Sequence, residues 1–396
     1  MPATLQAMNS AAMEKMDHPA RILRLQTALA DNRLDSLLIT HLPNIHYLSG
    51  FTGSSAILLV ANRSSVLFTD GRYRDQAQEE VRGSKIMIAR KSPLLAAGEW
   101  LAAHRVGSPP STERSKRPKS KSLKSGDPPF TVGVEPESLT AGARDRLAAA
   151  LKGKARLRPA PSFVEGARIV KDVAEIALIR RAVALGASLF NVAREKIRPG
   201  VTEVEVAGAI EYEARRAGAE GMSFPTILAS GTRSAIVHGR ASGARIPAGG
   251  FVVCDFGVIL AGYCSDRTRT VHVGQPTDEA RSLYASVLEA QQAAIAAVRP
   301  GATAADVDGA ARRVLRRRKL ARYFTHSTGH GLGLEIHEAP RLAAEQVQRL
   351  EPGMVLTIEP GVYVPGRWGV RIEDVVVVTT SGCEVLNPTD KELVII

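Results

Sequence analysis

Four carboxylates in the last third of the chain form two pairs, each flanking a predicted hairpin turn. Asp255 and Asp266 flank a turn at residues 260–261, and Glu359 and Glu373 flank a second turn centred on Gly366. The surrounding segments are rich in β-branched residues, as is typical of strands. A symmetric register would place Asp255 opposite Asp266, with Cβ atoms about 5 Å apart. Carboxylates so close repel each other and stay ionised only beside a cation, so the pattern predicts a cage for metal ions.

Histidines accompany these carboxylates. The segment HSTGHGLGLEIHEAP contains His326, His330 and His337, and an earlier segment, ASGTRSAIVHGRAS, contains His238. The glycines allow a tight backbone, so that one imidazole can bind metal while the others face an open site. Oxygen ligands with one imidazole suit two divalent first-row ions, such as manganese, cobalt, iron or zinc. A single histidine is often structural, but three in one short segment indicate a functional site.

Length and composition predict a protein of two domains without a membrane span. The 396 residues, 44% of them hydrophobic, suffice for two cores. No apolar run reaches the roughly 18 residues of a membrane helix, and the N-terminus lacks the apolar core of a signal peptide. We therefore expect a cytoplasmic protein. Three cysteines make no disulfide framework. Strand alternation directs Cys254 and Cys264 away from the face of the carboxylates, which predicts small buried side chains.

The net charge of +12 is concentrated in two basic runs. Residues 105–127 combine lysine and arginine with serine and proline, which predicts a disordered insertion in the first domain. Residues 312–322 follow a helical pattern and predict a solvated helix face, with an anion-binding or partner surface as the alternative. Neither run contains interleaved aromatic residues, which argues against nucleic-acid binding.

The chain divides near residue 164. Residues 18–163 alternate helical and strand patterns, which predicts a small α/β domain. A long helix is expected over 170–197, at the start of a second domain that spans 164–396.

The second domain contains a faint internal repeat. Residues 197–218 align with 298–319, and in both copies Arg-Pro-Gly precedes a threonine at a predicted helix N-cap, Thr202 or Thr303. Each copy leads towards one carboxylate hairpin. This order predicts a duplicated helix–hairpin unit with a two-fold axis through the metal site, and chance similarity of two helix starts is the alternative.

Five of these residues, in this order and context, resemble the ligands of the metallopeptidase family of methionine aminopeptidase, aminopeptidase P and prolidase: Asp255, Asp266, His330, Glu359 and Glu373. The resemblance spans 164–396 and implies an α/β protein with a duplicated α+β "pita-bread" catalytic domain. Residues 18–163 are similar to the creatinase/prolidase N-terminal domain through LLITHLPNIHYLSGFTGSSAILLV and LFTDGRYRDQA. Methionine aminopeptidases lack that domain, so the resemblance favours the branch that cleaves Xaa-Pro bonds.

The resemblance also implies a role for each site residue. The five ligands would hold two divalent metal ions, with manganese preferred, and Glu359 would in addition shuttle a proton. His238 and His337 resemble the catalytic histidines that stabilise the tetrahedral intermediate. His326 and Arg371 resemble residues of the substrate pocket.

The expected function is that of an Xaa-Pro aminopeptidase, with Xaa-Pro dipeptidase (prolidase) as the alternative. Its substrates would be small peptides with proline at the second position, and the resemblance implies a homodimer. A metal-free binding module of the same fold is a rival hypothesis, and a creatinase-like amidinohydrolase is a third. Both expect altered ligand positions, whereas all five are intact here.

Overall fold

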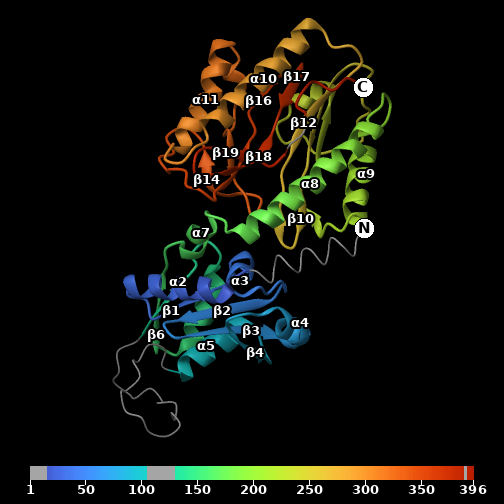
Figure 1. The fold of residues 1–396 in the computed structure, drawn as a ribbon. Coiled ribbons are helices and arrows are strands. Elements are labelled where there is room, and N and C mark those ends of the chain that lie inside the picture. The colour runs from blue at the N-terminus through green and yellow to red at the C-terminus, as the bar shows by residue number, and fades with distance from the viewer. Residues whose placement is uncertain (1–15, 105–129, 388–389) are drawn as a thin grey trace. The chain divides into compact units, whose positions relative to one another are not determined.

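A computed structural model describes residues 16–104, 130–387 and 390–396 (Figure 1). These residues form two compact units, one of Asp17–Ala167 and one of Met16 with Arg168–Ile396. The basic run at 105–127 lies outside the described residues. In the part of the chain that is described, no helix is long and apolar enough to cross a membrane.

The N-terminal unit is built on a mixed sheet with strand order β4-β3-β2-β1-β5-β6. Its strands are β1 (Ser36–Ile39), β2 (Ala56–Ala61), β3 (Ser64–Asp70), β4 (Lys85–Ala89), β5 (Phe130–Val134) and β6 (Ala155–Pro159). Its helices are α2 (His18–Asp31), α3 (Leu42–Ser49), η1 (Gly71–Tyr73), α4 (Arg74–Glu80), α5 (Pro93–Ala103) and α6 (Ala141–Leu151), and α7 (Phe163–Arg168) ends the unit. The alternation of helices and strands confirms the predicted α/β domain.

The C-terminal unit consists of two halves of similar construction. The first half contains α8 (Val173–Lys196), α9 (Glu203–Arg216), β7 (Gly221–Met222), β8 (Ile227–Ser230), η2 (Gly231–Ala235), β9 (Gly250–Asp255), β10 (Val258–Leu260), β11 (Tyr263–Cys264) and β12 (Thr268–Val273). The second half contains α10 (Asp278–Ala297), α11 (Ala304–Arg317), η3 (Ala321–Tyr323), β13 (Gly329–Gly331), β14 (Glu338–Leu342), β15 (Val355–Ile358), β16 (Gly361–Val364), β17 (Trp368–Arg371), β18 (Asp374–Val378) and β19 (Cys383–Val385). Each half thus begins with two helices, and its carboxylate pair lies at or near the ends of two paired strands, β9 and β12 in the first half and β15 and β18 in the second.

The predicted repeat is present in detail. Helices α9 and α11 begin one residue after Thr202 and Thr303, and each threonine closes a capping box with the third residue of its helix. In both halves, an arginine from a distant segment donates to the glycine carbonyl of the Arg-Pro-Gly turn. Arg245 Nη1 donates to the carbonyl of Gly200, and the guanidinium of Arg349 makes the equivalent bond to Gly301, at 2.7 Å in each case.

The register of the first hairpin differs from the prediction. Strands β9 and β12 pair so that Asp255 lies opposite Thr268, not opposite Asp266. The turn falls at Ala261 and Gly262, whose φ angles are 49° and 78°. A two-residue turn of this kind needs positive φ at both positions, which alanine rarely adopts. The expectation of a turn one residue earlier was therefore wrong.

The register of the second hairpin agrees with the prediction. Ile358 lies opposite Asp374, and Gly361 lies opposite Arg371. The same register, continued between the two strand pairs, places Glu359 opposite Glu373.

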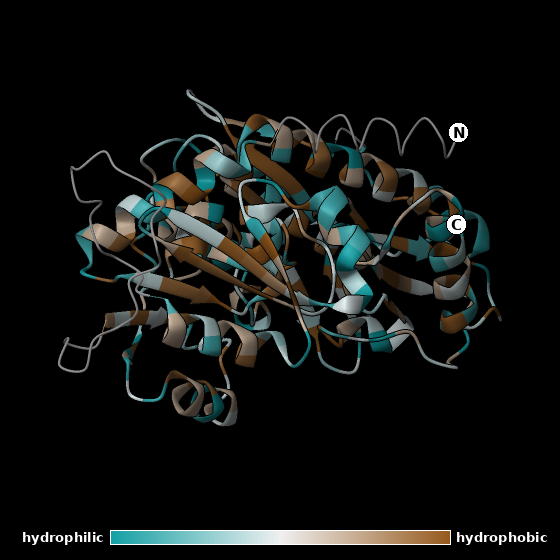
Figure 2. Ribbon diagram, turned by 90° about the horizontal axis from the view of Figure 1, so that it is seen from below, coloured by the Kyte–Doolittle hydropathy of each residue, from teal (hydrophilic) through white to brown (hydrophobic). Residues whose placement is uncertain are grey.

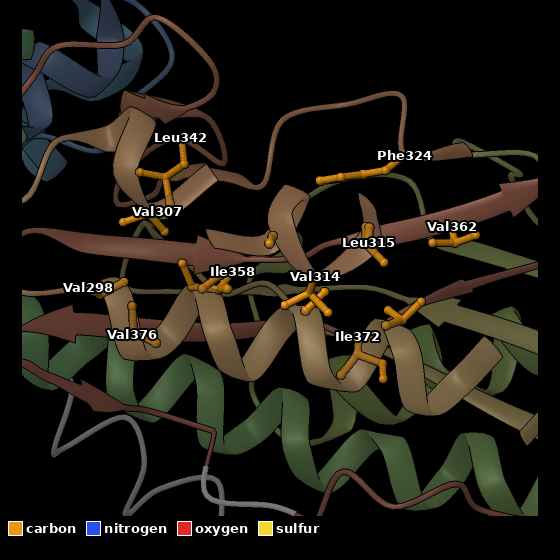
Figure 3. Packing of buried hydrophobic residues seen from close by; sticks show 14 of the residues in the cluster. Val298, Val307, Val314, Leu315, Phe324, Leu342, Ile358, Val362, Ile372 and Val376 are labelled. Atoms are coloured by element: carbon orange, nitrogen blue, oxygen red, sulfur yellow. The ribbon is translucent and has the colours of Figure 1, made fainter. Parts of the chain in front are cut away.

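The core of the second half contains the residue directly before each of these carboxylates. Ile358 and Ile372, which directly precede Glu359 and Glu373, are fully buried in one hydrophobic cluster. Figure 3 shows Ile358 and Ile372 close to Val314 of α11, within this cluster. Figure 2 shows that most strands of the chain are apolar, whereas the helices alternate between apolar and polar residues. The metal-site candidates therefore lie in strands or within two residues of a strand end, beside residues that are fixed by packing.

Two lesser predictions have different outcomes. Cys254 and Cys264 are buried as expected, and burial raises the pKa of Cys264 to about 12. The basic run that begins at Arg312 is not a uniformly solvated face, because Arg312 is only 28% exposed and pairs with Asp308 at 2.7 Å.

Candidate metal centre

All nine predicted site residues line one cavity of about 560 Å³ in the C-terminal unit. They are Asp255, Asp266, His330, Glu359, Glu373, His238, His326, His337 and Arg371. Strands position the innermost of them: β13 contains His330, and Glu359 follows β15 directly. Sequence positions as far apart as 238 and 373 are thus brought to one place.

The closest grouping surrounds His330. One ligand atom each of Asp266, His330 and Glu373 lies within 4.8 Å of the others. His330 Nε2 is 3.4 Å from Glu359 Oε1 and 3.6 Å from Asp266 Oδ2. The ring orientation follows from its other nitrogen, since Nδ1 lies 2.9 Å from the carbonyl oxygen of Gly331, which can only accept. Nδ1 therefore carries the proton, and the Nε2 lone pair faces the carboxylates.

The electrostatics of the carboxylates favour protonation unless a cation is present. Burial, and after it the neighbouring Glu373, Asp255 and Glu359, raises the pKa of Asp266 well above its usual range. Burial raises the pKa of Glu359 to about 8 and that of Glu373 well above normal. Burial also lowers the pKa of His330 to about 4, which keeps its imidazole neutral. Neutral imidazole among crowded carboxylates is the state in which such groups ligate metals.

The buried oxygens fit a divalent ion. Within the described residues, Asp255 Oδ1, Asp266 Oδ1 and Glu373 Oε1 are buried without a hydrogen-bond partner. Each such oxygen would cost free energy if it stayed without a partner, and a divalent cation supplies one. The donor set of carboxylate oxygens and one imidazole is the set that first-row divalent metals accept.

Arg371 is held by the protein itself, although the family resemblance implied a substrate contact for it. Its guanidinium donates to Asp255 Oδ2 at 2.5 Å, to Tyr363 Oη at 2.6 Å, to Thr268 Oγ1 at 3.0 Å and to the carbonyl of Val237 at 3.1 Å. The side chain is only 3% exposed. These contacts fix Asp255 and leave the guanidinium little capacity for a ligand.

His326 is fixed by the same network. Because arginine only donates, Tyr363 Oη accepts from Arg371, and its hydroxyl hydrogen can point to His326 Nε2 at 3.0 Å. His326 Nδ1 donates to the carbonyl of Ser327 at 2.8 Å. Burial and the nearby Arg371 lower the pKa of His326 to about 4. Both nitrogens are therefore occupied, so His326 can present only its ring surface to the cavity.

His238 and His337 are the exposed histidines of the cavity. The ring of His337 meets that of His330 edge to face, with centroids 4.4 Å apart. Burial, followed by the charge of His238, lowers the pKa of His337. Imidazoles so placed can donate hydrogen bonds to a ligand beside the carboxylates.

Sequence reasoning missed two buried hydroxyls that organise the site. Thr268 is fully buried, and its hydroxyl donates to Glu373 Oε2 at 2.7 Å. Tyr363 joins Arg371 to His326, as described above. A polar residue at an inward-facing strand position was the available signal for both, since buried hydroxyls require partners.

Comparisons with known proteins agree with the geometry. The profile of metallopeptidase family M24 matches residues 177–380, and that of the creatinase/prolidase N-terminal domain matches 21–170. The Xaa-Pro dipeptidase of Pyrococcus horikoshii is 35% identical over 92% of this chain and 95% of its own length. Among solved structures, an Xaa-Pro dipeptidase from Bacillus anthracis is 36% identical with a TM-score of 0.86, and covers 96% of this chain and 100% of its own. The X-Pro aminopeptidase from Thermotoga maritima is 32% identical with a TM-score of 0.81, over the same shares. The predicted family and fold are confirmed.

Proposed function

Because the chain belongs to metallopeptidase family M24, and is therefore a peptidase, we propose that it is an Xaa-Pro dipeptidase. The relatives and structural neighbours carry this name more often than that of the aminopeptidase. They thus favour the alternative that the sequence alone ranked second. The observation that carries the proposal is the cavity in which five ligand candidates, three further histidines and two arginines without a carboxylate partner in the described part of the chain converge.

The metal ligands would be Asp255, Asp266, His330, Glu359 and Glu373. When bound, divalent ions supply Lewis-acid polarisation of the scissile carbonyl and a nucleophile of lowered pKa. The oxygen-rich donor set supports manganese as the ion. Metal analysis of the reconstituted protein tests this assignment: two equivalents of manganese are expected, and fewer than one equivalent contradicts it.

The other residues of the cavity would act on the peptide directly. Glu359 would accept a proton at its carboxylate and deliver it to the leaving proline nitrogen. His238 and His337 would donate hydrogen bonds to the oxygen on which negative charge develops. The ring of His326, with no free nitrogen, would form an apolar wall suited to the proline ring.

A free C-terminal carboxylate would find its receptor in this cavity. Arg341 of β14 is the cross-strand partner of His330, so both side chains lie on one face of the strand pair. Arg341 and Arg240 both line the cavity, are exposed, and have no carboxylate partner among the described residues. A guanidinium binds a carboxylate with two parallel hydrogen bonds. A dipeptide has its carboxylate one residue beyond the scissile bond, and therefore close to the metal ligands. We assign the carboxylate to Arg341 because Arg341 lies directly opposite the candidate ligand His330.

Turnover of Ala-Pro compared with Ala-Pro-Ala and Ala-Pro amide tests the proposal. We expect the manganese-loaded wild type to prefer Ala-Pro. Arg341→Met should raise KM for Ala-Pro by about 10- to 100-fold, the value of a charge-assisted pair, and leave Ala-Pro amide unaffected. Arg316→Met, which removes an exposed guanidinium from α11, is the matched control.

Xaa-Pro aminopeptidase is the second candidate, and the Thermotoga maritima neighbour supports it. Equal or faster turnover of Ala-Pro-Ala would replace the dipeptidase by this activity. Homodimer formation, which the family resemblance implies, and a cytoplasmic location, which the sequence predicts, are also part of the proposal. Light scattering of the purified chain tests the first, and fractionation of the source cells tests the second.

A further inference from the structure

A buried carboxylate outside the cavity holds the segment that contains His238. Glu203 is the first residue of α9 and is fully buried. Its Oε1 accepts from the backbone and hydroxyl of Ser230, at 2.8 and 2.9 Å. Its Oε2 accepts from the backbone and hydroxyl of Ser242, at 3.1 and 2.7 Å. One side chain thus clamps both ends of the segment 230–242, and His238 lies between the clamped ends.

A guanidinium closes the same segment from within. Arg233 Nε lies 3.2 and 3.1 Å from the two oxygens of Glu203, and Arg233 Nη2 donates to the carbonyl of Arg240 at 2.9 Å. Between these anchors, Ile236 is 49% exposed and His238 is exposed as well. The segment has little apolar burial of its own here, so polar contacts fix the position of the imidazole: the anchors at the ends of the segment and, directly before His238, the bond from Arg371 to the carbonyl of Val237.

We propose that Glu203 is a positioning residue that sets the catalytic placement of His238. The proposal rests on the proposed function, because it assigns His238 a hydrogen bond to the reacting oxygen. Glu203 itself touches neither substrate nor metal ligand, since its carboxylate oxygens are occupied by Ser230, Arg233 and Ser242. It acts through the backbone of the segment, where a displacement of about 1 Å is enough to cost 100-fold in rate.

The second half of the duplicated unit contains an anchor of the same type. Asp308 of α11 is 1% exposed and accepts from the hydroxyl of Thr328 at 2.8 Å and from Arg312 Nε at 2.7 Å. Arg312 Nη2 in turn donates to the carbonyl of His326 at 2.6 Å. Each half therefore uses a buried helix carboxylate and an arginine to hold its histidine segment. The two carboxylates do not occupy equivalent repeat positions, so the duplication alone does not account for both anchors.

A double-mutant cycle separates positioning from general stabilisation. Ala-Pro hydrolysis is measured for manganese-loaded wild type, Glu203→Gln, His238→Ala and the double variant. We expect His238→Ala to lower kcat by 100- to 1,000-fold. Glu203→Gln should lower kcat by about 10- to 100-fold, with KM and manganese content within two-fold of wild type. The double variant should be no more than two-fold worse than His238→Ala, because the two residues act as one unit. Multiplied losses would overturn the proposal.

Tryptic cleavage of the metal-free chain after Arg240 is a second readout, independent of activity. Glu203→Gln should raise the rate of this cleavage at least 10-fold, whereas Glu205→Gln, which alters only the cap of the same helix, should leave it unchanged. Unchanged cleavage in Glu203→Gln would refute the anchor. If Glu203→Gln does not fold, Ser242→Ala removes one hydroxyl and should change kcat and cleavage in the same directions, by smaller factors. An inactive wild type with faster cleavage in the variant would contradict the proposed function and leave the anchor standing.

Discussion

Removal of the metal ions is expected to make the stability of the protein fall as the pH rises above about 6.5. The reason lies in the buried carboxylates, of which Glu359 has its pKa raised from 4.5 to about 8 by burial. A carboxyl whose pKa is higher in the folded state binds more protons there than in the unfolded chain. Its stabilising contribution is complete below about pH 4.5 and is lost as the pH rises to about 8. The pKa values of Asp266 and Glu373 are raised in the same direction.

The two buried histidines confine this loss to neutral and alkaline pH. The pKa values of His330 and His326 are lowered from 6.5 to about 4. The contribution of these histidines to the free energy of unfolding therefore increases as the pH rises from about 4 to about 6.5. This increase offsets the loss of stability caused by Glu359 up to about pH 6.5. Above that pH both imidazoles are neutral in the folded and in the unfolded chain. Between about pH 6.5 and 8, at about 1.4 kcal/mol for each pH unit, Glu359 alone accounts for about 2 kcal/mol. Asp266 and Glu373 increase the loss.

Urea unfolding at about pH 6.5 and 8.5, with chelator or with manganese, measures the effect. The chain has two tryptophans, Trp100 and Trp368, so a Trp100→Phe background makes fluorescence report the C-terminal unit alone. Between the two pH values, the free energy of unfolding of the metal-free protein should fall by at least about 2 kcal/mol. That of the manganese-loaded protein should not fall, because bound metal requires deprotonated ligands. Glu359→Gln should reduce the loss by about 2 kcal/mol, while the exposed control Glu345→Gln should not alter it. A metal-free stability that is constant over this range would refute the reasoning.

Three further substitutions test other parts of the site. His337→Ala should keep its metal but lose about 100- to 1,000-fold in kcat. Peptide turnover and metal analysis of the same sample measure both, and normal turnover would exclude a catalytic role. Thr268→Val removes the hydroxyl that orients Glu373 and should weaken manganese affinity about 10-fold in a titration of the apoprotein. Gly257→Ala would drive a Cβ into the carbonyl oxygen of Ser265, so urea unfolding should show a loss of about 3 kcal/mol or more.

Local patterns made much of the fold predictable from the sequence. The starts of α9 and α11 were located because Arg-Pro-Gly precedes an N-cap threonine in both copies of the repeat. The second hairpin was placed correctly because its turn contains Gly366, which adopts φ 72° without a Cβ penalty. The first hairpin was misplaced because Ala261 adopts a positive φ, a conformation that an alanine in the sequence does not predict. Local chemistry thus decides where a prediction succeeds.

The polar contacts that fix the site were not predictable in the same way. Glu203 accepts from Ser242 across 39 positions, and Thr268 donates to Glu373 across 105. No local pattern connects residues so far apart. Only the requirement that buried polar atoms find partners links them, and it needs the fold to be known. The candidate ligands were found because they form family-like motifs, whereas the residues that hold them were not.

The register of the first hairpin makes the two carboxylates of the first pair, Asp255 and Asp266, chemically unequal. Because Asp255 lies opposite Thr268, it is available to Arg371, whose guanidinium supplies a permanent cation. Asp266 is displaced past the strand pair and lies beside His330 and other carboxylates, where burial and like charges raise its pKa. Arg371 therefore balances the charge of Asp255, whereas Asp266 needs a metal ion or a proton. We accordingly expect metal to be held most strongly around His330, with Asp255 contributing chiefly through its buried oxygen Oδ1, which has no hydrogen-bond partner among the described residues.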